Sequence, residues 1–129
     1  MTIRSLTGAA LLALLGAGLP AAAADAPEPA VLRVLVVETV DLKAYQRELE
    51  ALLKLERTVV PEATLHVWRA RFAGADAGAL VVTAELPGLS ALAKIDELAR
   101  HNPEFQATVK RIEALRRVIS DSLYEAAAP

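Results

Sequence analysis

The chain has 129 residues, a formal net charge of −2 at pH 7, 54% hydrophobic residues and no cysteine. This length suits one domain with its own core, and the lack of cysteine excludes disulfides, thiolate metal sites and thiol nucleophiles. The weak negative charge excludes a basic surface of the strength that nucleic acids require.

The first 24 residues have the layout of a secretory signal peptide. Arg4 is the only charged side chain before Asp25, a short run rich in leucine and alanine follows it, and four alanines come after Pro20. A bilayer span needs about 20 consecutive apolar residues, and glycines interrupt this run. We therefore predict cleavage after Ala24, which gives a periplasmic or secreted protein without a membrane segment.

The next stretch predicts a tether, a strand and a helix. Residues 25–30 contain two prolines and predict an extended tether. Residues 31–37 are apolar except for Arg33 and predict a strand buried on both faces. Asp41 is a suitable N-cap for a helix over residues 42–58. That helix carries a stripe at spacings of three and four that faces a core, made by Leu42, Tyr45, Leu49, Leu52, Leu53 and Glu56.

A hairpin follows the first helix. Residues 64–72 alternate and predict a strand with Leu65 and Val67 on one face and His66 and Trp68 on the other. Gly74, Asp76 and Gly78 indicate the connecting loop. Residues 79–86 predict a third strand, which is apolar on both faces as far as Glu85.

The last third of the chain predicts two helices and a strand. Ser90 is a candidate N-cap for the second helix. Asn102, Pro103 and Glu104 form a new start signal, because an Asn cap, a first-turn Pro and an acidic residue all favour a helix N-terminus. Residues 118–124 predict the last strand.

The fold class is therefore α+β. The order is ferredoxin-like, β-α-β-β-α-β, with the second helix broken in two and a four-stranded antiparallel sheet. In this topology the first and third strands are central, and they are the most apolar here. The charges that protect edge strands fall on the second and fourth, at Arg69, Arg71, Arg117 and Asp121. We assign residues 31–125 to this domain and residues 126–129 to a tail.

Apolar residues occupy both faces of the central strands. Helices cover only one face of such a sheet, so branched apolar side chains remain on the other. An exposed apolar patch of this kind usually marks an interface. We therefore predict a homodimer in which sheet packs against sheet.

From residue 31 to 125 the chain resembles the dimeric α/β-barrel superfamily, which includes antibiotic-biosynthesis monooxygenase-like and NIPSNAP-type domains. The resemblance lies in the element order, in the run Asn102-Pro103-Glu104-Phe105-Gln106 that opens the last helix, and in Ser122-Leu123-Tyr124. It implies this fold and a dimer. Members include cofactor-free oxygenases and haem-degrading enzymes that use an Asn, a Trp and a His. No such trio can be placed here, so no active-site residue is carried over.

Charged residues within apolar strands are the candidate ligand-binding groups. If Arg33, Arg69, Arg71 and Glu85 lie on the open face, they bring charge into an apolar dimer cleft. One interpretation is an ion pair of Arg33 or Arg69 with Glu85, because buried charges need partners. The other is that this charged group holds an anion or carboxylate in a hydrophobic ligand pocket, with Arg33, Arg69 and Glu85 as the ligand-binding candidates.

The remaining polar and aromatic candidates favour structural roles. We expect His66 to be packed, Trp68 to fill the core, His101 to complement the negative end of a helix, and Tyr124 to pack at a strand end. No acidic or histidine cluster has the spacing of a metal site, so no catalytic residue, metal or cofactor is assigned.

The sequence favours a non-enzymatic exported homodimer that binds a small apolar ligand in the dimer cleft. The alternative is a cofactor-free monooxygenase-like enzyme, whose cleft shields an electron-rich substrate that reacts directly with O₂. A third class, a module that binds partners through an edge strand, is disfavoured by the edge arginines.

Overall fold

A computed structural model describes residues 27–72 and 74–128. The signal peptide expected over residues 1–24 and its cleavage point lie outside these residues. Within the described part, no helix is long and apolar enough to cross a membrane.

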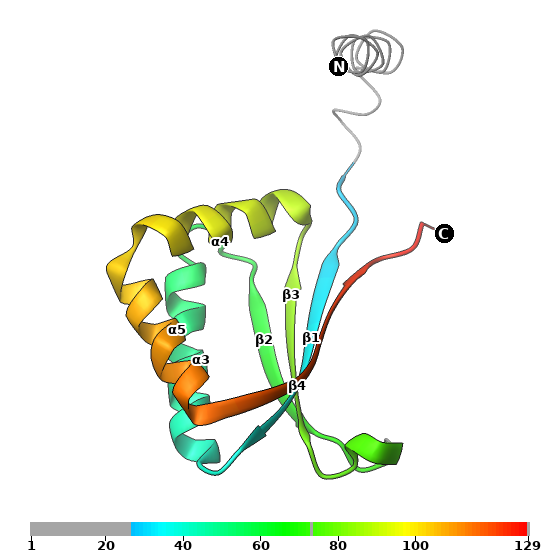
Figure 1. The fold of residues 1–129 in the computed structure, drawn as a ribbon. Helices are drawn as coiled ribbons and strands as arrows, with labels where there is room; N and C mark the ends of the chain where they lie inside the picture. Colours follow the sequence, from blue (N-terminus) through cyan, green and yellow to red (C-terminus); the bar gives the residue numbers. More distant parts are fainter. Residues whose placement is uncertain (1–26, 73, 129) are drawn as a thin grey trace, which may run out of the picture.

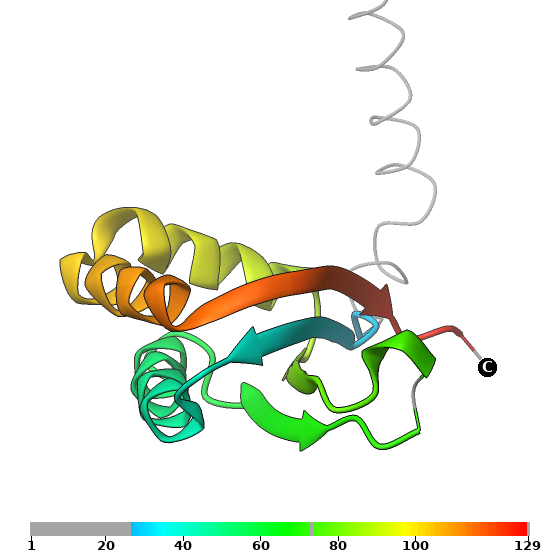
Figure 2. The same ribbon diagram turned by 60° about the horizontal axis from the view of Figure 1, so that its bottom comes forward.

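The described chain forms a four-stranded antiparallel sheet with three α-helices. The elements are β1 (Val31–Thr39), α3 (Leu42–Glu56), β2 (Thr64–Arg69), the short 3₁₀ helix η1 (Gly74–Asp76), β3 (Leu80–Leu86), α4 (Leu89–His101), α5 (Pro103–Leu115) and β4 (Arg116–Glu125). The strand order is β2-β3-β1-β4, with the edge strands β4 and β2 at the outer limits of the sheet (Figure 2). The predicted α+β ferredoxin-like fold, with central first and third strands, is confirmed.

All four strands differ in extent from the prediction: β1 continues to Thr39, β3 begins one residue later, at Leu80, and β2 and β4 also change their bounds. β2 ends at Arg69 and not at residue 72, because the chain turns into the hairpin loop there: the Gly78 N–H donates to the Ala70 carbonyl at 2.7 Å, with Gly78 at a φ of 89°. A positive φ of this kind favours glycine. β4 begins at Arg116, two residues before the predicted start, and pairs with the end of β1 through Thr39.

Side-chain caps fix two helix starts as predicted. The Asp41 carboxylate accepts from the Ala44 N–H at 3.0 Å, and the Asn102 side chain accepts from the Phe105 N–H at 3.0 Å, with Pro103 as the first helical residue. Each cap satisfies a backbone donor that the helix leaves free.

The start of α4 contradicts the prediction that Ser90 caps it. The helix begins at Leu89, and its N-cap, Gly88, has no side chain to cap with. The Glu28 carboxylate accepts instead from the N–H of Ser90 at 3.3 Å and from its hydroxyl. This cap comes from 62 positions earlier in the sequence, so no local pattern could indicate it. A Cβ at Gly88 would collide with Glu28.

All three α-helices lie against one face of the sheet (Figure 1). Strand alternation turns Val31, Leu35 and Val37 toward the helices, where each is at most 5% exposed. Leu32, Val34 and Val36 are only half-buried on the face that no described helix covers. The prediction that apolar residues remain on an uncovered face is therefore confirmed.

Candidate functional site

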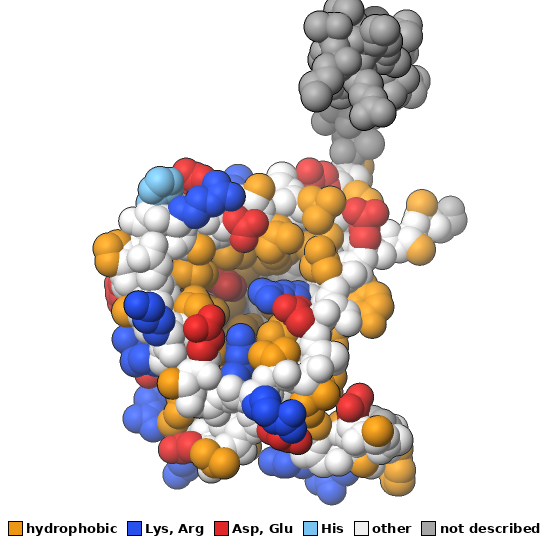
Figure 3. Space-filling view, viewed as in Figure 1, with side chains coloured by type: hydrophobic (Ala, Val, Ile, Leu, Met, Phe, Trp, Pro, Cys, Tyr) orange, Lys and Arg blue, Asp and Glu red, His pale blue; other side chains and the backbone are white. Residues whose placement is uncertain are grey.

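A cavity of about 340 Å³ lies between the helices and the sheet. Space-filling shows it as a hollow with hydrophobic walls and charged side chains inside (Figure 3). All four strands and all three α-helices contribute to it. The apolar lining comprises Val31, Leu35, Leu49, Leu52, Leu65, Val82, Ala84, Leu86, Leu92, Ile95, Ala99, Phe105, Val109, Ile112 and Leu123.

Five charged residues also line this cavity. They are Arg33 from β1, Glu56 from the end of α3, Asp96 from α4, Glu113 from α5 and Arg116 from the start of β4. Three of them have environments that bear on function.

Arg33 is clamped to the neighbouring edge strand. Its Nε donates to Asp121 Oδ1 at 3.0 Å and its Nη2 to Asp121 Oδ2 at 2.7 Å. This bidentate pair raises the pKa of Arg33 and lowers the pKa of Asp121, chiefly through the side-chain hydrogen bonds. The pair links the side chains of β1 and β4 beside the cavity.

Glu56 is a carboxylic acid in an apolar setting. Burial raises its pKa to about 7, although the charge of Arg33 opposes the shift. No hydrogen bond or ion pair links its carboxyl group to another residue of the described chain. Near neutral pH it is therefore present both as an acid that can donate a proton and as a base that can accept one.

Arg116 lines the cavity and lies beside Tyr45. Its Nη1 donates to the Tyr45 hydroxyl at 3.1 Å, and its guanidinium carbon is 5.9 Å from the centre of the Tyr45 ring. Its Nε is buried without a hydrogen-bond partner. No carboxylate of a described residue lies within ion-pair distance of Arg116.

The structure does not bring the three predicted ligand-binding residues together. Arg33 lines the cavity, whereas Arg69 and Glu85 do not. Leu32 is the β1 residue opposite Glu85, and Arg33 is opposite Ala84. Arg33 and Glu85 therefore point to opposite faces, and the expected ion pair between them is wrong.

The other expectations for these arginines also need correction. Arg33 lies on the helix-covered face and not on the open one. Arg69 donates to the Gly78 carbonyl at 3.2 Å rather than pairing with Glu85, and Arg71 lies beyond the end of β2.

Trp68 does not fill the core as expected. It is 57% exposed on the open face, and its Nε1 donates to the Thr83 hydroxyl at 2.9 Å. Side chains alternate along β2, and Leu65 and Val67 take the positions that face the helices. Trp68 therefore points to the open face. His66 is exposed beside it, with ring centroids 5.9 Å apart. Tyr124 is also 57% exposed, opposite Leu32, so none of the three reaches the cavity.

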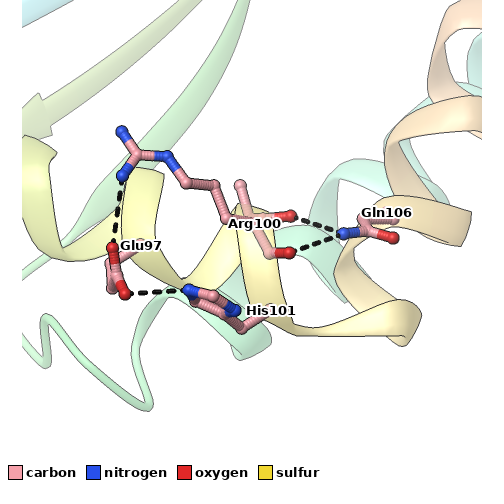
Figure 4. Close-up of polar contacts among 5 residues, drawn as sticks. Glu97, Arg100, His101 and Gln106 are labelled. Carbon is pink, nitrogen blue, oxygen red and sulfur yellow. Dashed lines mark hydrogen bonds and ion pairs between the residues drawn. The ribbon is translucent and has the colours of Figure 1, made fainter.

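His101 lies in the corner between α4 and α5 (Figure 4). Its Nε2 is 3.0 Å from Glu97 Oε1. The Gln106 side chain of α5 donates to the carbonyls of Ala99 and Arg100 and so links the two helices. The place of His101 in the last turn of α4 agrees with the expected structural role. No group of three or more His, Asp or Glu side chains is placed to hold a metal within the described residues.

Glu56 and Arg116 also line the cavity, but neither was among the site residues predicted from sequence. A signal existed for Glu56, which continues an otherwise apolar helical stripe. Arg116 carried no signal, because it was expected to precede the last strand, and only the tertiary fold places it against Tyr45.

Comparison of the sequence with protein-family models and with curated proteins finds no match. Solved structures match by fold. The cofactor-independent oxygenase SnoaB from Streptomyces nogalater matches with a TM-score of 0.57 at 14% identity, over 78% of this chain and 96% of that one. A NIPSNAP family protein with unknown function from Agrobacterium tumefaciens, Atu4242, matches with a TM-score of 0.54 at 13% identity, over 76% and 86%. The chain therefore shares the fold of these proteins, as the resemblance predicted.

Proposed function

We propose that this protein binds a small, largely apolar molecule in the cavity between the helices and the sheet. The observation that carries the proposal is a cavity of about 340 Å³ with apolar walls and a few convergent charged groups. Ligand pockets typically span roughly 300–1,000 Å³ and have this mixture of groups. The site thus differs from the dimer cleft considered from sequence, because it lies on the opposite face of the sheet.

Filling the cavity tests this proposal. Ala99 on α4 lines the cavity, whereas Ala93 on the same helix is exposed. The neutral fluorescent probe N-phenyl-1-naphthylamine should bind the wild type and the Ala93→Phe control. Its affinity should fall roughly tenfold or more, about 1.4 kcal/mol, in Ala99→Phe. No binding to the wild type, or equal affinity for the two variants, would overturn the proposal.

The enzymatic alternative is supported by Glu56. A general base works best when its pKa lies near the working pH, and burial brings this carboxyl to about 7 inside the cavity. In this candidate function, Glu56 removes a proton from a weakly acidic substrate and the resulting carbanion reacts with O₂. Oxidation of a CH₂ group to C=O then reduces O₂ fully, with one oxygen atom in the product and one in water. The fold shared with a cofactor-independent oxygenase agrees with this chemistry.

Oxygen uptake with anthrone, a carbon acid flanked by two aromatic rings, tests the enzymatic candidate. Glu56→Gln should slow uptake by roughly 10²-fold or more. Glu50→Gln, an exposed residue of the same helix, should leave it unchanged. Uptake no faster than in buffer, or equal rates for the two variants, would exclude this function.

We also propose that two copies pair through the open face of the sheet. Half-buried Leu32, Val34 and Val36 form its apolar centre, beside the exposed Trp68 and Tyr124. A twofold axis would place this patch against itself and leave the cavity on the far side of each sheet uncovered.

Light scattering at micromolar concentration tests the pairing. The wild type should have the mass of a dimer and Trp68→Arg that of a monomer. Val40→Arg should remain dimeric, because Val40 is fully exposed beyond the end of β1. A monomeric wild type would contradict the proposal.

Export through residues 1–24 is the last part of the proposal. Expression in a Gram-negative host should give a periplasmic protein whose N-terminal sequence begins at Asp25. Retention of Met1 in a cytoplasmic protein would contradict export.

A further inference from the structure

Two arginines of the sheet, Arg33 and Arg117, bind carboxylates through the same edge of the guanidinium group. Arg33 uses its Nε–Nη2 edge on Asp121. Arg117 uses the same edge on Glu38, with Nε at 3.1 Å and Nη2 at 2.6 Å from Oε2. Two parallel donors on one edge match a carboxylate and make a strong, directional pair.

Arg116 has the same edge without an acceptor. The Tyr45 hydroxyl engages only Nη1. Nε is buried without a partner, and Nη2 donates no hydrogen bond to any described residue. A buried donor left unpaired is costly, and more so when it belongs to a charged group.

The acidic groups near Arg116 do not accept hydrogen bonds from its Nε–Nη2 edge. Asp121 is close enough for the charge of Arg116 to lower its pKa, but Arg33 already holds both of its oxygens. Glu56 and Glu113 line the same cavity, and neither lies within ion-pair distance of Arg116. Together these carboxyl groups would repel a doubly charged ligand more than a singly charged one.

We propose that the ligand of the cavity is an organic monocarboxylate, with its carboxylate on the Nε–Nη2 edge of Arg116 and its apolar body among the aliphatic lining. This inference rests on the proposed binding function and specifies the ligand class. Arg116 lines the cavity together with Leu35, Val82 and Ile112, so one molecule can meet both kinds of group. The carboxylate would satisfy the buried Nε and the apolar body would leave water.

Calorimetric titration with octanoate and with 1-octanol tests this inference, because the two probes share their chain and differ in charge. The wild type should bind octanoate roughly tenfold to a hundredfold more tightly than octanol, the range expected for a charge-assisted pair. Arg116→Gln should lose this preference and still bind octanol. Arg117→Gln, the adjacent residue that faces Glu38, should behave as the wild type.

A conservative variant distinguishes loss of the carboxylate contact from loss of folding. Arg116→Lys keeps the charge but not the two-donor edge, so it should show an intermediate preference, and circular dichroism should confirm that both Arg116 variants are folded. Equal wild-type affinities for the two probes, or an unchanged preference in folded Arg116→Gln, would overturn the monocarboxylate inference but not the proposed binding function. If neither probe binds, the proposed binding function fails together with the monocarboxylate inference.

Discussion

The two faces of the sheet differ in how they combine charged and apolar side chains. The helix-covered face brings Arg33, Glu56 and Arg116 around a cavity. The open face carries Leu32, Val34 and Val36 at its centre, with Trp68 half-exposed to solvent. Burying a carboxyl group without a partner, as at Glu56, costs free energy, so its position is poorly explained by stability alone. This difference supports the proposals that the covered face binds a ligand and that the open face pairs with a second copy.

Truncation on the covered face should have the largest effect. Leu80 faces the helices and is 5% exposed, whereas Leu89 at the start of α4 is 50% exposed. Leu80→Ala should lower the free energy of unfolding by about 2–5 kcal/mol, because it removes apolar contacts and leaves a void. Leu89→Ala should cost less than about 1 kcal/mol. Equal losses in urea titrations would show that the covered face is not the main core.

Neutralising Glu56 should stabilise the protein in a pH-dependent way. Its pKa rises from 4.5 to about 7 on folding, mainly through burial, so the native state binds the proton more tightly than the unfolded state. Below pH 4.5 the Glu56 carboxyl group is protonated in both states and does not lower the free energy of unfolding. As pH rises from 4.5 to 7, the carboxyl group ionises in the unfolded state but not in the native state, so the free energy of unfolding falls. At pH 8, Glu56→Gln should be more stable than the wild type by up to about 3 kcal/mol.

Unfolding curves of both proteins at pH 4, 6 and 8 check this prediction. The two should converge at pH 4, where the wild-type carboxyl is protonated in both states. Exposed Glu50→Gln is the matched control and should follow the wild type throughout. A gap between wild type and Glu56→Gln that does not change with pH would contradict the burial of this carboxyl group.

The ion pair between Arg33 and Asp121 should contribute least to the free energy of unfolding. Both side chains are close to half exposed, at 50% and 44%, and exposed pairs are screened by water. Asp121→Asn should cost less than about 1 kcal/mol at low salt. Because the pKa of Asp121 is lowered on folding, its contribution is present at neutral pH and is lost as pH falls through the folded pKa. A much larger loss in thermal unfolding would mean that the ion pair organises the cavity wall.

Strand alternation predicts side-chain parity, but it does not indicate which face the helices cover. The sequence indicated that Arg33 shares a face with Leu35, and this parity is confirmed because both line the cavity on the helix-covered face. Both faces of β1 are apolar, however, so hydrophobicity alone could not choose between them. The dimer-cleft hypothesis therefore considered Arg33 on the open face, and Trp68 was expected in the core, although each lies on the other side.

The other features that could not be predicted depend on contacts between residues that are distant in the sequence. The Glu28 cap on α4 and the contact of Arg116 with Tyr45 join residues 62 and 71 positions apart. Caps such as Asp41 and Asn102 act within three residues and could be predicted. Glu56 was visible as a charged member of an apolar stripe, but its environment depends on Arg33 and on the depth of the cavity.

Mapping of probe binding by ¹H–¹⁵N NMR tests the central claim most directly. Titration with N-phenyl-1-naphthylamine should shift the amide signals of residues that line the cavity, such as Leu35, Ala84 and Ile112. The Trp68 indole signal, on the open face, should move little. Shifts confined to Trp68, Tyr124 and their neighbours would place the ligand on the open face and contradict the claim that the helix-covered cavity is the binding site.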